Sequence, residues 1–416
     1  MGASAARSVS FCAGSREALR FAWVRGYPIA IWGAASRPEP SGVVSLREPS
    51  GGGAPVFGRH APAFVFSRFD VQRGGDGRDV IEADVVVEPS TLRFVASDGS
   101  LDHRPTNAAQ ADFVRGLKAS GADAINRVLD LDERRSWPDR LPYVASREEY
   151  QEAVGAAVKE IRGGALQKVV LSRVVRIELH AGLDLLTLFD TLREAYPQAF
   201  VCLVSLPNQG VWVTATPETL LEVDAQFLRT MALAGTQAVS PDTETRDVLW
   251  SDKFIQEQAL VSSEIRHALH GAGFQDFSES GPGTVRAGNL VHLRTDFTVQ
   301  PASDHVLPQD HLQVAADRLL EGLHPTPAVC GIVRESARRF IQAAERHDRD
   351  RYTGYLGPVG SGQPSTLYVN LRCAQIIGSA AYLYVGAGIV GSSSPEEEFE
   401  ETVQKSKTLG ALLERL

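Results

Sequence analysis

The segment Tyr382–Leu413 constrains the fold of this 416-residue chain most strongly. It reads YLYVGAGIVGSSSPEEEFEETVQKSKTLGALL, so an almost uncharged stretch runs directly into an acidic one. The apolar part predicts a buried strand, and the glycines and serines after it predict a turn. Pro395 suits the first turn of a helix, where glutamates also complement the helix dipole. The segment therefore predicts a buried strand followed at once by a helix.

Three charged residues of that helix follow one another at helical spacing. Glu398, Glu401 and Lys405 are three and four residues apart, which predicts that they share one face. Two carboxylates with a lysine one turn further on are suited to a hard cation and an anionic ligand together. The helix dipole gives a purely structural explanation for part of the acidic run.

The composition indicates a globular protein with a large core. Hydrophobic residues make up 43% and charged residues 22% of the chain. A net charge of −9 without a basic run argues against nucleic acid as a partner. The four cysteines have no metal-like spacing, and we find neither a leader segment nor an apolar run of the ~20 residues that cross a membrane. These features predict a cytoplasmic protein with no membrane partner.

The character of the chain changes near residue 145. Residues 1–144 are rich in Gly, Pro, Arg and Ser around short apolar segments, which predicts a variable, β-rich N-terminal part. Residues 145–416 alternate between strand and helix patterns and predict the main domain. Ser146 followed by Glu149 predicts a capping box that begins the first helix of this domain.

A lysine stands among the apolar residues of one predicted strand. In LQKVVLSRVVRIEL, alternation places Lys168 on the same face as Leu166, Val170 and Val174. In one interpretation, the aliphatic part of Lys168 lies along the apolar surface and its ammonium reaches solvent, as is common for a lysine near the end of a strand. A desolvated lysine that acts as a general base is the other.

Two glutamates raise a similar question. Glu218 follows Pro217 at a break between two predicted strands, where a carboxylate is either solvated or functional. Glu257 lies within the apolar stripe of a predicted helix that includes Phe254 and Val261. An ionised carboxylate that faces a core is costly unless it is paired, protonated or bound to a metal. Glu257 is therefore a candidate functional residue.

Several segments, in order along the chain, carry a family resemblance. They are LQKVVLSRVV, TPETLLEV, MALAGTQ, LHPTPAVCGI, YTGYLGPVG, YVNLRCAQI and GAGIVGSSSPEEEFEET. Over residues 145–416 the chain resembles the chorismate-utilising enzymes, which include isochorismate synthase, salicylate synthase and the large subunit of anthranilate synthase. The resemblance implies an α+β fold with two face-to-face β-sheets and helices outside. It also implies a catalytic domain with a buried chorismate site and Mg²⁺ as cofactor.

The family pattern, carried over residue by residue, implies a role for each candidate. Lys168 matches the base that activates water, and Glu218 matches the acid that helps the 4-hydroxyl leave. Glu257 and Glu401 match magnesium ligands, with Glu398 in support. The positions that match the groups holding the substrate carboxylates are Gly235, Thr236, Tyr352, Arg372, Gly388 and Lys405.

Two positions bear on which chorismate reaction to expect. Anthranilate synthases typically carry glutamine at the position of Lys168, and aminodeoxychorismate synthases often carry lysine at that of Ala234. The resemblance therefore implies water as the nucleophile and no obligatory glutaminase subunit. LHPTPAVCGI and YTGYLGPVG look like isochorismate synthases, particularly those of the menaquinone pathway. Phe254 and Gln256 depart from the family, which commonly has polar or acidic residues just before the metal glutamate.

The expected reaction is the Mg²⁺-dependent isomerisation of chorismate to isochorismate, by addition of water at C2 and loss of the 4-hydroxyl. Salicylate synthase, which adds elimination of pyruvate, stays an alternative, and the large subunit of anthranilate synthase is a less favoured one. A catalytically silent homologue that binds a chorismate-like acid is disfavoured, because Lys168, Glu218 and Arg372 are all retained.

Overall fold

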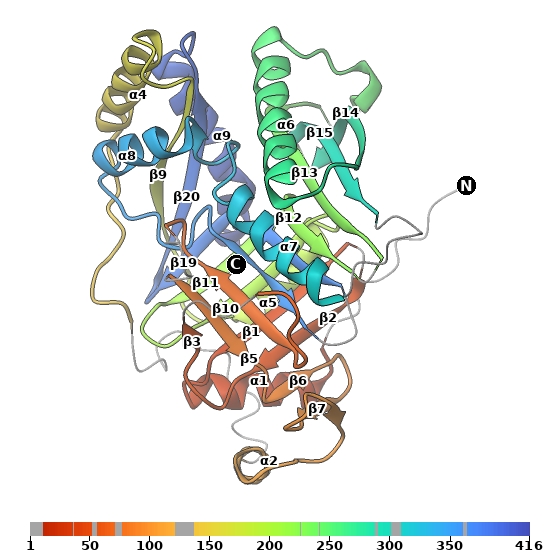
Figure 1. Ribbon diagram of the computed structural model, residues 1–416. Coiled ribbons are helices and arrows are strands. Elements are labelled where there is room, and N and C mark those ends of the chain that lie inside the picture. Colours follow the sequence, from red (N-terminus) through yellow and green to blue (C-terminus); the bar gives the residue numbers. More distant parts are fainter. Residues whose placement is uncertain are drawn as a thin grey trace.

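The chain folds into two antiparallel β-sheets that pack face to face, with helices outside (Figure 1). The structure is a computed structural model, and it describes residues 11–35, 37–51, 56–70, 77–120, 137–224, 226–240, 242–287, 290–300, 309–360 and 364–416. Within these ranges one sheet has eleven strands and the other has nine. The predicted α+β fold with two sheets is confirmed.

The strand order of each sheet mixes distant parts of the chain. The eleven-stranded sheet runs β16 (Gly331–Ile332), β9 (Lys168–Glu178), β20 (Ala380–Ile389), β19 (Cys373–Ile377), β11 (Val211–Thr216), β10 (Phe200–Ser205), β1 (Ile29–Ala34), β2 (Arg37–Val44), β6 (Val85–Val87), β7 (Leu92–Val95) and β8 (Leu101–Asp102). The nine-stranded sheet runs β14 (Ser278–Ala287), β15 (Leu290–Val299), β13 (Leu228–Ala238), β12 (Thr219–Val223), β18 (Ser365–Val369), β17 (Tyr355–Val359), β4 (Ala63–Ser67), β5 (Arg78–Glu82) and β3 (Ser50–Gly51).

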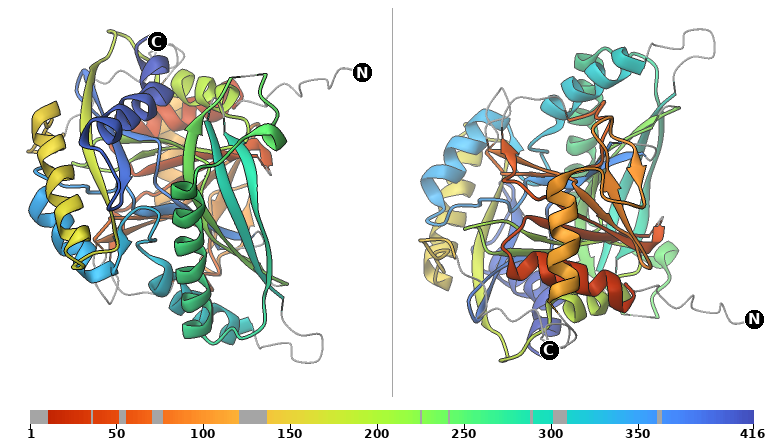
Figure 2. Two further views of the ribbon diagram at one scale, coloured as in Figure 1. Left: turned by 90° about the horizontal axis from the view of Figure 1, so that it is seen from above. Right: turned by 90° about the horizontal axis from the view of Figure 1, so that it is seen from below.

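Helices cover the outer face of each sheet (Figure 2). The helices are α1 (Ala13–Val24), α2 (Ala108–Ala119), α4 (Arg147–Arg162), α5 (Leu185–Ala195), the 3₁₀ turn η2 (Thr245–Asp247), α6 (Asp252–Ala272), α7 (Gln309–Leu323), α8 (Arg334–Ala344) and α9 (Pro395–Leu413). The eleven-stranded sheet is covered by α1, α5 and the end of α9. The nine-stranded sheet is covered by α6 and α7. None of the described helices is long and apolar enough to span a membrane.

Aromatic side chains fill the space between the two sheets. The ring of Phe66 on β4 meets that of Trp212 on β11 edge-on, with 6.0 Å between centroids. Phe200 on β10 stacks on Tyr368 of β18 at 4.0 Å. Because each pair joins one strand from each sheet, these contacts fix the distance between the sheets.

Strands from the first part of the chain extend both sheets. In the eleven-stranded sheet β1 pairs with β10, so that Ile31 lies opposite Leu203. In the nine-stranded sheet β4 pairs with β17, so that Phe66 lies opposite Leu356. Residues 1–10 and 121–136 lie outside the described residues. The division of the chain at residues 144 and 145 stays a prediction.

The helix α4 begins as its sequence predicts. The side chain of Ser146 accepts a hydrogen bond from the backbone N–H of Glu149 at 3.2 Å. The carboxylate of Glu149 accepts one from the backbone N–H of Ser146 at 2.9 Å. The predicted capping box is thereby confirmed, and α4 packs its apolar face against β9.

Two chain segments cross from one sheet to the other side by side. The first joins β11 to β12 through Pro217 and Glu218, and the second joins β18 to β19 through residues 370–372. The backbone N–H of Val369 donates to the Glu218 carbonyl at 3.0 Å, and that of Ala215 donates to the Arg372 carbonyl at 3.1 Å. The crossings therefore hold Glu218 and Arg372 next to each other, between the sheets.

Candidate functional site

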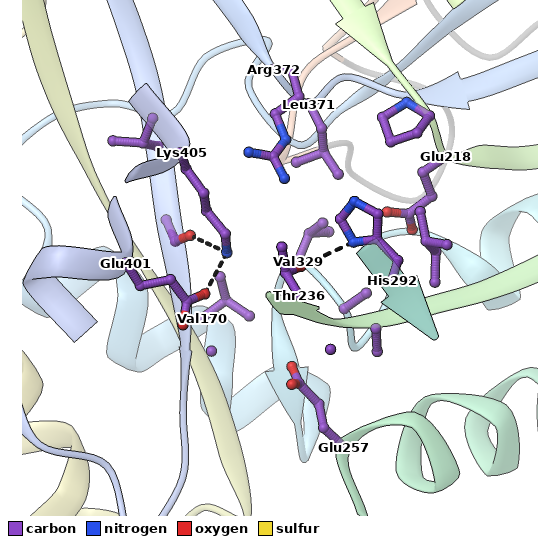
Figure 3. Close-up of a pocket in the computed structure, with 18 of the residues that line it drawn as sticks. Val170, Glu218, Thr236, Glu257, His292, Val329, Leu371, Arg372, Glu401 and Lys405 are labelled. Carbon is purple, nitrogen blue, oxygen red and sulfur yellow. Dashed lines mark hydrogen bonds and ion pairs between the residues drawn. The ribbon is translucent and has the colours of Figure 1, made fainter. Parts of the chain in front are cut away.

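A cavity lies where the two sheets meet α6 and α9 (Figure 3). Nine of the predicted site residues line it: Glu218, Gly235, Thr236, Glu257, Tyr352, Arg372, Gly388, Glu401 and Lys405. Lys168 lies directly behind the lining, in contact with Glu257. Glu398 is also outside the lining, and it is buried at 1% exposure.

Lys168 is completely buried. Its side chain has 0% exposure, and its Nζ lies 2.7 Å from Oε1 of Glu257, which reaches across from α6. The interpretation of a stem that reaches solvent is therefore wrong. A Cβ at Gly388, on the neighbouring strand β20, would lie 2.8 Å from Glu257 Oε1 and 3.3 Å from Lys168 Cε. The absence of a side chain at residue 388 makes room for this ion pair.

Glu218 is buried at the crossing between β11 and β12, with 3% exposure. Burial raises the pKa of Glu218 to about 8, and the nearby positive charges of Lys168 and Arg372 reduce that effect only in part. Because this pKa lies above neutrality, the carboxyl is mostly protonated at pH 7. Glu218 can therefore donate a proton to a group in the cavity.

Arg372 brings a guanidinium into the cavity from the other crossing. Its backbone has a φ of 50°, a conformation that is uncommon for a residue with a side chain. Among the described residues, no carboxylate lies within ion-pair distance of Arg372, and its buried Nη1 has no hydrogen-bond partner. A buried cation without a partner is costly, so the cavity is suited to an anionic ligand at this point.

The wall of the cavity that faces Thr236 and His292 carries a second lysine and a second glutamate (Figure 3). Nζ of Lys405 lies 2.6 Å from Oε1 of Glu401, one helical turn earlier on α9. The same ammonium donates to the Gly386 carbonyl at 2.9 Å. Lys405 is therefore held against β20 and presents its charge to the cavity from the side opposite Thr236.

Tyr352 forms part of an aromatic wall. Its ring stacks on Tyr384 with 5.5 Å between centroids, and Tyr384 stacks on Trp212 at 5.4 Å. A Cβ at Gly386 would lie 2.8 Å from the Tyr352 hydroxyl oxygen. The small residue on β20 therefore lets this hydroxyl approach the cavity.

His292 lines the cavity but has no signal in the sequence. It lies on β15 directly opposite Thr236 on β13, and its Nδ1 is 3.0 Å from the Thr236 hydroxyl oxygen. Burial lowers the pKa of His292 to about 3, with a further contribution from Arg372 and Lys405. The imidazole is therefore neutral at working pH and hydrogen-bonds Thr236. A single histidine in a strand has no characteristic spacing, and only the strand register brings it here.

Gly235 lets the backbone of β13 turn inside the cavity. Its φ is +67°, in the region that favours glycine. A Cβ at this position would lie 3.1 Å from the Cβ of Phe254 on α6. Phe254 therefore covers Gly235 and closes one side of the cavity with an apolar ring.

The carboxylates of the cavity fit a magnesium ion in part. Glu257 from α6 and Glu401 from α9 face the same space, and Mg²⁺ is commonly held by one or two carboxylates together with substrate oxygens. In the described part of the chain no three His, Cys, Asp or Glu side chains converge as a metal-binding group. Glu398 therefore does not join the other two carboxylates in such a group, and its role toward a metal stays a prediction.

Comparison with known proteins places this cavity in a family. Residues 122–414 match the model of the family described as chorismate binding enzyme. The vibriobactin-specific isochorismate synthase of Vibrio cholerae is 31% identical over 316 residues, which are 75% of this chain and 77% of that protein. Isochorismate synthase MenF of Escherichia coli is 30% identical over 332 residues, which are 78% of this chain and 72% of that protein.

Solved structures show the same fold. The menaquinone-specific isochorismate synthase MenF of Escherichia coli superposes with a TM-score of 0.70 at 22% identity, covering 94% of this chain and 91% of that one. Anthranilate synthase component I of Streptococcus pneumoniae superposes with a TM-score of 0.59 at 18% identity, covering 87% and 81%. Together with the family match, these similarities show that the chain belongs to the chorismate binding enzymes.

Proposed function

We propose that this chain converts chorismate to isochorismate. The observation that carries the proposal is the grouping of three side chains at one cavity: Lys168 directly behind the lining, Glu218 with a raised pKa, and Arg372, which pairs with no carboxylate of the described residues. These three groups match the needs of the reaction, which are a base for water, an acid for the leaving hydroxyl and a cation for a substrate carboxylate. Relatives at about 30% identity that are named isochorismate synthases support it.

The proposed isomerisation is balanced by two proton transfers. Lys168 accepts a proton from the water that bonds to C2 of the ring. The ring double bonds shift, the bond between C4 and its oxygen breaks, and the leaving hydroxyl takes a proton from Glu218. One water enters and one leaves, so no oxidant or second substrate is needed. Arg372, Tyr352 and Lys405, which all line the cavity, orient the carboxylates of the substrate.

Magnesium is part of the proposal. Glu257 and Glu401 would hold the ion, which would supply positive charge to a substrate carboxylate. Because Glu257 also pairs with Lys168, and Glu401 with Lys405, each glutamate can balance either its lysine or another cation. The two lysines are therefore expected to compete with the metal for the carboxylates.

We also propose that the enzyme needs no glutaminase subunit and serves menaquinone synthesis. Lys168 with Ala234, which lines the cavity, supports water rather than ammonia as nucleophile. The resemblance of LHPTPAVCGI to menaquinone-pathway enzymes supports the pathway, although relatives named for siderophore synthesis are similar to the same extent. Deleting the gene and measuring menaquinone and catechol siderophores in the same cultures tests it. Loss of siderophore with normal menaquinone would overturn the pathway assignment.

The activity is tested by incubating the purified chain with chorismate and Mg²⁺ and separating the products by chromatography. We expect isochorismate, formed without glutamine, and the return of chorismate when isochorismate is the substrate. Salicylate and pyruvate that accumulate in step with chorismate loss would instead indicate a salicylate synthase. Anthranilate formed from ammonia at a similar rate would contradict the role of Lys168.

A further inference from the structure

A buried ion pair lies behind the cavity wall, outside the groups described above. Arg349, in the segment between α8 and β17, pairs with Glu345 through two hydrogen bonds. Nε of Arg349 donates to Oε2 at 2.8 Å, and Nη2 donates to Oε1 at 2.6 Å. The two side chains are 2% and 3% exposed. Such a pair is retained at a desolvation cost that a pair of apolar residues would avoid.

The remaining donors of Arg349 reach two walls of the cavity. Nη2 donates to the carbonyl of Val170 on β9 at 2.7 Å, and Nη1 donates to the carbonyl of Val329 at 2.8 Å. Val170 and Val329 both line the cavity. The last donor lies 3.5 Å from the Thr353 hydroxyl, so every N–H of this guanidinium has a partner.

Glu345 also accepts hydrogen bonds from β9, two residues beyond Val170. Its Oε1 accepts hydrogen bonds from the backbone N–H of Ser172 at 2.7 Å and from the Ser172 hydroxyl at 2.9 Å. Burial by itself would raise the pKa of Glu345, but the charge of Arg349 and its hydrogen bonds keep that pKa below its ordinary value. The pair therefore holds β9 at Val170 and at Ser172, close to Lys168 on the same strand.

We propose that Arg349, oriented by Glu345, is a positioning residue that fixes the strand of Lys168 relative to the Val329 wall. An apolar pair of similar size would fill the space but would hold neither carbonyl. The planar fork of arginine reaches both carbonyls and both carboxylate oxygens at once, which a lysine cannot do. The effect on turnover rests on the proposed function, because it assumes that Lys168 acts on water.

The test compares Arg349→Lys with Arg346→Lys, an exposed arginine in the same segment. Arg349→Lys keeps the charge that balances Glu345 but loses the fork. Misplacing a catalytic group by ~1 Å costs about 10²-fold in rate, so we expect kcat per folded molecule to fall 10- to 100-fold. We expect KM to change less than about threefold, because Arg372 is untouched, and Arg346→Lys to leave both constants near wild type.

Amide hydrogen exchange gives a readout that does not depend on activity. In Arg349→Lys the amides of residues 170–173 should exchange faster, whereas Arg346→Lys should leave them unchanged. Glu345→Gln, which keeps the shape but weakens the pair, should also speed exchange at Ser172. Unchanged exchange in both variants, or a kcat within about twofold of wild type in Arg349→Lys, overturns the proposal. If the wild-type chain makes no isochorismate, the proposed function fails while the exchange data still test the positioning role.

Discussion

Among the described residues of the site, each of the two lysines is paired with a glutamate, whereas Arg372 is paired with none. Lys168 pairs with Glu257, and Lys405 pairs with Glu401. Arg372 has no carboxylate within ion-pair distance among the described residues. Because a buried cation seeks an anion, the cavity favours a ligand with at least one carboxylate near Arg372. We therefore expect a neutral analogue of chorismate to bind this site more weakly than chorismate.

Replacement of Lys168 separates its chemical role from its packing role. Lys168→Met keeps most of the buried stem but removes the amine. We expect the chain to fold and the rate of isochorismate formation to fall by at least ~10²-fold, the usual contribution of a general base. The measurement is kcat together with the circular dichroism spectrum. Near-normal turnover would contradict the assignment of Lys168 as the base.

The pKa of Glu218 predicts the alkaline limit of activity. The proton-donating form dominates below its pKa of about 8, so kcat should be independent of this group at lower pH and should fall as the pH rises through that value. The side chain of Glu218→Gln cannot transfer a proton, so this variant should lose most of its activity. Any activity that remains should no longer fall as the pH rises through about 8. The pH profile of kcat checks the prediction. A profile that stays flat to pH 10 would show that protonated Glu218 is not required.

Calorimetric titration of Mg²⁺ tests the carboxylates without relying on activity. Glu257→Gln and Glu401→Gln each remove one charged oxygen donor, so we expect each to weaken Mg²⁺ binding by more than about tenfold. Glu398→Gln should have a smaller effect, because that carboxylate is not part of the cavity lining. Equal binding in all three variants and the wild type would remove these glutamates from the metal site.

At the scale of single elements, β20 shapes the site through the side chains that it lacks. Gly388→Ala would place a methyl group 2.8 Å from Glu257 Oε1 and should separate the Lys168 ion pair. Gly155→Ala, in the middle of α4, meets nothing within 4 Å and is the control. We expect Gly388→Ala to lower kcat by at least about tenfold at similar thermal stability. Gly155→Ala should keep full activity and gain roughly 0.5–1 kcal/mol of stability.

A result in which Gly388→Ala retains wild-type turnover would show that the Lys168–Glu257 contact tolerates a shift, and that its geometry does not limit the rate. Loss of activity in both glycine variants would instead indicate that activity is sensitive to a glycine-to-alanine substitution far from the cavity as well. Thermal unfolding of both variants separates these outcomes from simple loss of the fold.

Local sequence patterns predict those site residues whose charge differs from the apolar residues around them in the same strand or helix. Lys168 breaks an apolar alternation and Glu257 breaks an apolar stripe, so each was visible without a partner. Glu398 lies three residues before Glu401 on α9, as the spacing predicts, but it is buried at 1% exposure and is not part of the cavity lining. His292 was missed because its place beside Thr236 depends on the register of β13 and β15.

At the scale of the whole molecule, both sheets depend on strands from the first part of the chain. Removal of residues 1–144 would take away β1 and β4. It would leave one edge of β10 and one edge of β17 without a hydrogen-bonded partner strand. Exposed apolar edges promote aggregation. We therefore expect residues 145–416 expressed alone to be insoluble, as judged by size-exclusion chromatography. Co-expression of residues 1–144 as a separate chain should restore soluble protein, and a soluble, active 145–416 fragment would contradict the prediction.

The pairing of these strands could not be read from the sequence. The segments of β1 and β4 are both short apolar runs, yet β1 joins the eleven-stranded sheet and β4 joins the nine-stranded one. Their choice of partner is made by contacts such as Phe66 with Trp212 between the sheets, which have no local signal. The family resemblance supplied the two-sheet architecture, because it carries long-range information that periodicity does not.

The pairing of β9 with β20 also has a consequence for biosynthesis. Val170 lies opposite Gly388, so the strand that carries Lys168 leaves the ribosome long before the strand that covers it. During that interval the nascent β9 has an open edge, and contacts between distant segments form slowly. A premature stop anywhere before α9 would also remove Glu401 and Lys405. Any product that stops before α9 therefore lacks two residues of the cavity lining, and one that stops before β20 also leaves an unpaired edge on β9, which promotes aggregation.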